Sequence, residues 1–427
     1  MLTERVYRRT MCAMRASAAR VVDAVSPGDL LVAGQALGEP TALLDTLFAA
    51  HRGLDGVRLF VGMSVSSVLD RVPDGISVFS FVGMGRNAKL LALGRLGLIP
   101  CHMSDLSWAM TSGPLRPDVA LVLVSPPDSD GLCSLGVASD YIWPAVAAAQ
   151  VVLAEINPNV PRIAGDTAIP FERLDGFVES DRPLPEYPRS MPSPSEEMIA
   201  KRVAEFVRDG SCIQVGVGRL GEAVLNAAAS YRDLGVHTGM IGEAILELMR
   251  TGVITNARKP IDTGLTVAGS ILGGPKAIAT AAARPDLRLR SVTHTHSPSV
   301  IAQLDNFLSV NSAIEVDLLG QVNAEAANGR YFGGIGGSVD YMRPAVRAPG
   351  GRSVVALPAT ARGEVSRIVP QVGRVTVGRS DIDVVVTEYG TAELRGVSEC
   401  ERAARLIEIA APEHRKGLRE AARTLGL

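Results

Sequence analysis

The amino-acid sequence predicts two successive open-sheet α/β domains, and three observations support this fold class. The chain has 427 residues, which exceeds the size at which a single hydrophobic core keeps growing. Short continuous runs of valine and leucine alternate with helix-like stretches, as in parallel sheets that helices cover on both faces. A proline-rich segment separates the two halves. Because aromatic residues make up only 4% of the chain, the cores must consist mainly of Ala, Val, Leu and Ile.

The first half contains several apolar runs that end at glycine, proline or asparagine. Their shortness and these flanking residues favour strands over buried helix segments. We expect strands at Asp29–Ala33, Val57–Gly62, Ile76–Val82, Val119–Ser125 and Val151–Ile156. Helices are expected at Thr41–His51 and Asn87–Leu96.

Residues 181–197 are predicted to link a first domain, residues 1–180, to a second domain, residues 198–427. Prolines recur through this segment, and proline is excluded from helix interiors and central strands. Its last residues, Ser195–Glu197, are expected to cap a helix over Ala200–Val207. The strand–helix alternation then restarts. We expect strands at Ser211–Val215, Gly235–Thr238, Ala313–Leu318, Ser353–Leu357 and Ile382–Thr387, and helices at Glu222–Ala229 and Glu243–Arg250.

Charge and cysteine usage exclude several classes of function. Lys and Arg total 43 and Asp and Glu total 45, a balance that argues against binding to nucleic acid or to a membrane surface. The five cysteines are scattered along the chain, which favours reduced thiols over a disulfide framework or a zinc ribbon. The charged N-terminus lacks the apolar run of a signal peptide, and no apolar run is long enough to span a bilayer. We therefore expect a cytoplasmic protein.

The sharpest local motif is the loop Gly216–Gly221, which has the pattern G-x-G-x-x-G between an expected strand and an expected helix. Glycines at such a turn let backbone amides approach a phosphate or an anionic oxygen. A tight strand-to-helix turn is the alternative. A dinucleotide site also requires an acidic residue at the end of the next strand. That strand ends at Gly239, and Asp233 precedes it, which disfavours an NAD(P)-dependent oxidoreductase.

A second glycine cluster, Gly333–Gly337, has four glycines in five residues. Such a stretch leaves backbone N–H groups uncovered and lets a ligand lie close. A flexible hairpin is the alternative. We favour contact with a ligand because Asp340-Tyr341 and a return strand are expected directly after the cluster.

Ordered matches through nearly the whole chain make the sequence resemble the acetyl-CoA hydrolase/transferase family, which includes 4-hydroxybutyrate and acetate CoA-transferases. The matching segments are Val124–Asp128, Gly131–Gly136, Ala154–Asn157, Asp181–Glu186, Ile213–Gly218, Leu234–Thr238, Gly252–Asn256, Asn311–Leu318, Gly320–Val322, Gly333–Gly337, Ser366–Pro370 and Thr387–Gly390. The resemblance implies two tandem CoA-transferase-type α/β domains, usually in a homodimer or a larger assembly. It also implies an acyl-CoA and a small carboxylate or other acceptor as substrates, with no metal or nucleotide cofactor.

The chemistry implied by the resemblance is transfer of coenzyme A between an acyl-CoA and a carboxylate, or hydrolysis of the thioester. A glutamate attacks the acyl-CoA carbonyl, and the resulting anhydride is converted to a glutamyl-CoA thioester. Backbone amides of the glycine loops hold the oxyanion. By resemblance, the residues that contact coenzyme A are Gly216, Val217, Gly218, Arg219, Leu220, Gly333, Gly337 and Arg362. Arg362 replaces the family's usual lysine and keeps a charge that suits a phosphate.

The sequence departs from the family at the nucleophile. The family's glutamate follows a His-Thr pair, whereas here Gly239 follows His237-Thr238. Glycine has no side chain to attack a carbonyl, so we expect a divergent mechanism. Glu243 is a candidate substitute, but a first-turn acid also interacts favourably with the helix dipole, and we favour that structural role.

The acceptor pocket also looks altered. His294 and His296 form a His-x-His pair where the family more often has Tyr-Thr-Asn-Asp-Pro. On a strand the two imidazoles would share one face, which suits general-base chemistry or a metal. Two histidines alone do not make a zinc site, so no metal is expected. The sequence thus predicts an acyl-CoA-processing member of this family; a catalytically silent CoA-binding or scaffold homologue is the alternative, and the oxidoreductase ranks third.

Overall fold

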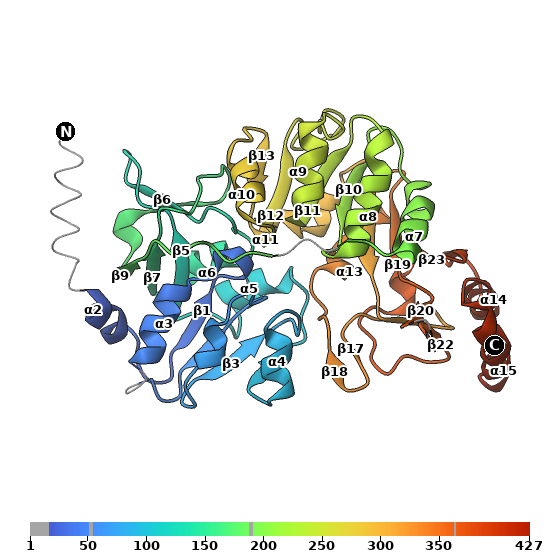
Figure 1. Ribbon diagram of the computed structural model, residues 1–427, viewed down its shortest axis with the longest axis horizontal. Coiled ribbons are helices and arrows are strands. Elements are labelled where there is room, and N and C mark those ends of the chain that lie inside the picture. Colours follow the sequence, from blue (N-terminus) through green and yellow to red (C-terminus); the bar gives the residue numbers. More distant parts are fainter. Residues whose placement is uncertain (1–16, 51–53, 188–190, 363) are drawn as a thin grey trace. The chain divides into compact units, whose positions relative to one another are not determined.

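The computed structural model describes residues 17–50, 54–187, 191–362 and 364–427 (Figure 1). The chain divides into two compact units, Met1–Pro188 with Gly269–Thr293, and Arg189–Ala268 with His294–Leu427. The chain thus returns to the first unit after residue 268. The division predicted from the sequence, residues 1–180 and 198–427, placed this segment in the second domain. The alternation of apolar runs continues through Gly269–Thr293, so the sequence carries no break that marks the return.

The first sheet has the order β4-β3-β2-β1-β5-β7-β9, and its neighbouring strands are parallel. The strands are β1 (Leu30–Ala33), β2 (Arg58–Phe60), β3 (Ser77–Ser80), β4 (Leu96–Leu98), β5 (Val119–Val124), β7 (Val151–Ile156) and β9 (Gly176–Glu179). Every residue of β5 is buried, because the sheet is covered on both faces. This explains the continuous apolar run in the sequence.

The second sheet has the order β13-β12-β11-β10-β14-β19-β23-β24. The strands are β10 (Cys212–Val215), β11 (Gly235–Ile241), β12 (Thr266–Ile271), β13 (Leu287–Leu289), β14 (Leu308–Ser312), β19 (Arg352–Ala356), β23 (Val384–Thr387) and β24 (Gly390–Glu393). In both sheets the first strand lies in the middle, the next three lead away on one side, and later strands fill the other side. The two sheets therefore share one order of connection, which confirms the predicted tandem α/β class.

Helices connect these strands. They are α2 (Ser17–Asp23), α3 (Thr41–Ala49), α4 (Asn87–Ala92), α5 (Asp105–Thr111), α6 (Ile142–Ala148), α7 (Pro194–Ala204), α8 (Arg219–Ala227), α9 (Glu243–Arg250), α10 (Pro275–Ala282), α11 (Val292–Thr295), α12 (Pro298–Ile301), α13 (Ser338–Ala345), α14 (Glu399–Glu408) and α15 (Pro412–Thr424). Among the described residues, no helix combines the length and the apolar composition that a membrane crossing requires.

The start of α7 corrects one prediction. The helix begins at Pro194, inside the segment predicted as linker, and its cap is Ser193 rather than Ser195. The Ser193 hydroxyl accepts a hydrogen bond from the Glu196 backbone N–H, and the Glu196 carboxylate accepts one from the Ser193 backbone N–H. This reciprocal capping box satisfies two backbone donors, and proline at the first helical position needs no donor.

Two strands that position the site differ from the sequence prediction. Strand β14 was not expected, because the buried polar residues Ser309 and Asn311 interrupt its apolar pattern. Strand β11 continues to Ile241, so Gly239 lies within the strand and not after it.

Candidate active site

The glycine loop Gly216–Gly221 lies at the carboxyl end of β10, where the strand order of the second sheet reverses. Strand β10 pairs in parallel with β11 on one side and with β14 on the other. In open α/β sheets, ligands bind outside the carboxyl ends of the strands at such a switch point. The predicted binding loop therefore occupies the position that the topology favours for a ligand.

Two of the loop's glycines are required by its geometry. Gly218 caps the N-terminus of α8 with φ of 128°, a conformation that other residues rarely adopt. A Cβ at Gly221 would clash with the carbonyl oxygen of Gly216, so a glycine is needed where the helix turns past the strand. Val217, Gly218 and Arg219 are exposed, whereas Leu220 is buried in the core. The loop thus offers an open backbone at the first turn of α8.

A buried polar network supports this loop. The Ser309 hydroxyl donates to the Gln214 side-chain oxygen at 2.8 Å, and the Asn311 amide donates to the Ser309 hydroxyl at 3.0 Å. The Asn311 oxygen lies 3.6 Å from the position of a Cβ on Gly216. Because these side chains satisfy one another, they hold the ends of β10 and β14 in a fixed arrangement beneath the loop.

The second glycine cluster, Gly333–Gly337, follows β18 (Arg330–Tyr331) and leads into α13. The predicted return strand is wrong, because a helix follows: Gly337 is its N-cap and Asp340 lies in its first turn, where a carboxylate suits the helix dipole. A Cβ at Gly333 would clash with the Ala324 carbonyl oxygen, and Gly336 has φ of 55°. The cluster is therefore a glycine-rich loop of defined conformation that leads into the N-terminus of α13.

Gly239 lies in β11 next to two aromatic rings. A Cβ at this position would be 3.0 Å from both Cε1 and Nε2 of His296, and 3.5 Å from the Tyr341 hydroxyl oxygen. Parallel pairing of Ile213 with Val236 shows that β10 and β11 end at the same edge of the sheet as the first glycine loop. The space that a side chain at position 239 would enter is thus bordered by an imidazole and a phenol.

The His296 imidazole is buried and neutral. Its Nδ1 lies 2.9 Å from the Thr295 hydroxyl, and burial lowers its pKa to about 3. The ring centroids of His296 and Tyr341 are 4.9 Å apart. Burial, followed by the charge of Asp340, raises the pKa of Tyr341 well above its usual value. The Tyr341 hydroxyl has no hydrogen-bond partner within the described ranges. It is a buried polar group available to a ligand.

The structure separates the two histidines of the His-x-His pair. The assumption that they lie on a strand is wrong, because His294 is in the short helix α11 and His296 follows it. His294 Nε2 lies 2.8 Å from an Asp262 carboxylate oxygen, and its ring centroid lies 5.5 Å from that of His237. Only His296 faces Gly239.

The other predicted site residues lie on neighbouring elements. Glu243 is the first residue of α9 and is half-buried. Arg362 is exposed, follows β20 (Thr360–Ala361) and has φ of 53°. Across the part of the chain that the structure covers, no hydrogen bond or ion pair joins either side chain to His296. Tyr341 was missed as a site residue, although its spacing of four residues from Gly337 places it on the same helix face as the end of the glycine cluster.

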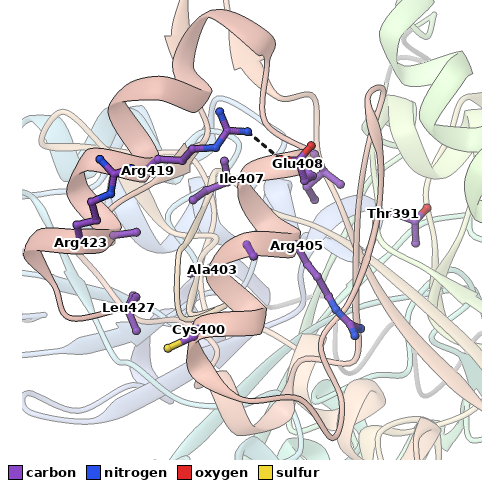
Figure 2. A pocket seen from close by; sticks show the side chains of 12 residues that line it. Thr391, Cys400, Ala403, Arg405, Ile407, Glu408, Arg419, Arg423 and Leu427 are labelled. Atoms are coloured by element: carbon purple, nitrogen blue, oxygen red, sulfur yellow. Dashed lines mark hydrogen bonds and ion pairs between the residues drawn. The ribbon is translucent and has the colours of Figure 1, made fainter.

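A cavity of about 530 Å³ lies elsewhere in the second unit, between α14, α15 and β24. Figure 2 shows Arg419 reaching Glu408, and these side chains form an ion pair at 2.9 Å. The lining also includes Cys400, Arg405 and Leu427. None of the predicted site residues lines it, so it is distinct from the site at Gly239.

Two sheets with one order of connection, each with its first strand at the switch point, and two glycine loops in the second unit define a tandem α/β protein with a ligand site at the carboxyl edge of its second sheet. The acetyl-CoA hydrolase/transferase N-terminal domain matches residues 1–186, and the C-terminal domain of the same family matches residues 273–422. The chain therefore belongs to the acetyl-CoA hydrolase/transferase family, as the sequence motifs indicated.

Individual relatives support this assignment. The 4-hydroxybutyrate coenzyme A transferase of Clostridium kluyveri is 34% identical over 97% of each chain. An acetyl-CoA hydrolase of Eremothecium gossypii is 27% identical over 88% of this chain and 81% of its own. The crystal structure of RipA from Yersinia pestis is similar with a TM-score of 0.91 and 31% identity, covering 96% of this chain and 97% of that one. The family thus contains both CoA-transferases and hydrolases.

Proposed function

We propose that this chain hydrolyses acyl-CoA thioesters with water that His296 activates, without a covalent glutamyl intermediate. The observation that carries the proposal is the geometry at Gly239. Its missing side chain leaves no carboxylate in the strand, and the Cε1–Nε2 edge of His296 lies 3.0 Å from where a Cβ would be. In the family's usual pattern, glutamate and asparagine would stand at positions 239 and 296. By this resemblance glycine and histidine stand in place of the pair, and the imidazole lies where it would meet a side chain at position 239.

Coenzyme A binding is assigned to the two glycine loops. Backbone N–H groups at Gly216–Leu220 and at Gly333 and Gly337 suit phosphate and thioester oxygens, and α8 and α13 begin at these loops. The exposed Arg362 suits a phosphate of the nucleotide part. We further propose that the protein acts as a homodimer in the cytoplasm.

The proposed reaction balances as a single hydrolysis. In the tautomer in which His296 Nδ1 donates to the Thr295 hydroxyl, Nε2 has a lone pair that accepts a proton from water. The water oxygen bonds to the thioester carbonyl carbon, and the resulting oxyanion accepts hydrogen bonds from loop amides and from the Tyr341 hydroxyl. The C–S bond then breaks, and the leaving thiolate takes the proton from His296. The products are a carboxylic acid and free coenzyme A.

The test compares two readouts on the same protein. A thiol assay follows the release of coenzyme A from acetyl-CoA and longer acyl-CoAs, and labelled acetate tests for exchange of the carboxylate. We expect thiol release that does not require an acceptor, and little exchange. Because burial lowers the pKa of His296 to about 3, its imidazole is a weak base, so His296→Asn should lower thiol release by less than the roughly 10²–10⁴-fold that a general base of near-neutral pKa contributes. It should leave binding of coenzyme A intact.

Each alternative has its own outcome in this test. Binding of coenzyme A without turnover on any thioester would support a silent scaffold. Rapid exchange with labelled acetate would show that a carboxylate, with Glu243 the nearest candidate in sequence, still acts as nucleophile. A His296→Asn variant with unchanged thiol release would remove His296 from the mechanism. Binding of NAD(P) would support the oxidoreductase hypothesis. That hypothesis is disfavoured because Asp233 lies before β11, not at its end, and pairs with Arg258.

A further inference from the structure

A second group of polar side chains lies beside the segment that carries His296. One ligand atom each of His237, Asp262 and His294 lies within 4.8 Å of the others. Asp262 and His294 are already paired at 2.8 Å, and the rings of His237 and His294 are 5.5 Å apart. Two imidazoles and one carboxylate form a donor set that zinc and related transition-metal ions bind.

One ring nitrogen of His237, Nε2, forms a hydrogen bond, and the other, Nδ1, has no partner among the described residues. Its Nε2 lies 3.1 Å from the Thr295 carbonyl oxygen. Because a carbonyl can only accept, Nε2 carries the proton and the lone pair lies on Nδ1. Nδ1 has no hydrogen-bond partner among the described residues, and the side chain is completely buried. Histidines that bind metals usually donate their other N–H to a carbonyl or carboxylate in this way.

We propose that His237 through Nδ1, together with Asp262 and His294, binds a divalent transition-metal ion of the zinc class, with water in the remaining coordination positions. The ion would take the place of the proton shared by Asp262 and His294. His296 is not one of the three, because its ring faces Gly239.

The surroundings favour this class of ion over magnesium or calcium. The buried Lys259 ammonium donates to the carbonyls of Val236 and Leu265, and its charge acts on Asp262. The positive charge repels any divalent cation, and hard cations, which require several oxygen ligands, have only one carboxylate here to offset it. Nitrogen donors retain their affinity for zinc-class ions, so the site should discriminate between the two classes.

A bound ion would stiffen the segment that carries the proposed base. The Thr295 carbonyl accepts from His237, and the Thr295 hydroxyl bonds to His296. Fixing His237 and His294 would therefore fix both sides of Thr295. The role of the ion is structural support of His296, and it does not touch the substrate.

Calorimetric titration of zinc chloride into the full-length, chelator-treated protein tests the proposal without an activity assay. We expect one ion per chain. His294→Ala and Asp262→Asn should each weaken binding by more than the roughly 10–100-fold that loss of an outer-shell partner costs. These side chains are 21% and 15% exposed, so their replacement does not open the core. Asparagine suits the positive φ of Asp262, which is 49°.

His296→Asn is the matched control, since it removes a neighbouring imidazole and should keep the affinity. Cobalt(II) absorption provides a second readout, with nitrogen and oxygen ligation and no thiolate band. Absence of zinc binding to the wild-type protein would overturn the proposal. The proposal would also be overturned if the His294→Ala and Asp262→Asn variants bound zinc as tightly as the wild type, or if the wild type bound magnesium as tightly as zinc. Circular dichroism establishes that each variant is folded.

Discussion

Substituting Gly239 by alanine tests whether His296 fills the space of the missing side chain. Gly239 does not have a positive φ, so alanine fits its backbone. In a free site this change stabilises a protein by about 0.4–1 kcal/mol, because the unfolded chain loses conformational freedom. Here the new Cβ would lie 3.0 Å from His296 Cε1 and Nε2. Overpacking of this kind costs about 1–3 kcal/mol, so we expect net destabilisation.

The same substitution in a His296→Asn background should have the opposite sign. Asparagine keeps the part of the side chain near the backbone and lacks the Cε1–Nε2 edge that the new Cβ would meet. We expect Gly239→Ala to be neutral or stabilising there, with an interaction energy of about 1–3 kcal/mol between the two positions. Denaturant-induced unfolding of all four proteins under one condition measures this cycle. Equal effects of Gly239→Ala in both backgrounds would refute the packing argument.

Further predictions concern the nucleophile, the loop and the first unit. Gly239→Glu alone should give little carboxylate exchange, because His296 obstructs the new side chain. Gly239→Glu combined with His296→Asn should restore exchange between acetyl-CoA and labelled acetate. Equal exchange by the two variants would contradict this prediction. Gly218→Ala should destabilise the protein by more than about 1 kcal/mol and weaken coenzyme A binding, because φ is 128°. The exposed helix control Gly417→Ala should stabilise it by about 0.5–1 kcal/mol in the same unfolding assay. Burial raises the pKa of Asp140 from 3.8 to about 6. The folded state therefore keeps the Asp140 proton at pH values where the unfolded chain has lost it, and Asp140 stabilises the folded state most at low pH. This contribution to stability is lost as the pH rises through 6. At about 1.36 kcal/mol per pKa unit, the free energy of unfolding of the wild type relative to that of Asp140→Asn should fall by about 3 kcal/mol from pH 3.8 to pH 7. A difference between the two proteins that does not change with pH would contradict this prediction.

The sequence was sufficient for the sheets but not for every strand. Runs such as Val119–Val124 are buried on both faces, and their continuous apolar character identifies them. Strand β14 was missed because the polar Ser309 and Asn311 are satisfied by Gln214, a residue about a hundred positions away. Such long-range compensation has no local sequence signal. The same limit applies to the return of residues 269–293 to the first unit.

The candidate site was predicted in its parts but not in its pairing. The glycine loops follow from local turn chemistry, whereas the loss of a nucleophile at Gly239 stays a prediction from the resemblance to the family. The contact between Gly239 and His296 joins positions 57 apart in the sequence, so only the fold reveals it. His294 and His296 were treated as one pair because they are two residues apart. Instead His294, in α11, contacts Asp262, and His296, which follows the helix, lies beside Gly239.

A single turnover in heavy-oxygen water tests the central claim most directly. The chain is mixed in excess with acetyl-CoA, and mass spectrometry then follows the product acetate and the protein. Direct attack by water predicts one heavy oxygen in each acetate molecule and none in the protein. Heavy oxygen in a protein carboxylate, or a glutamyl-CoA thioester on the chain, would contradict the role assigned to His296 and Gly239.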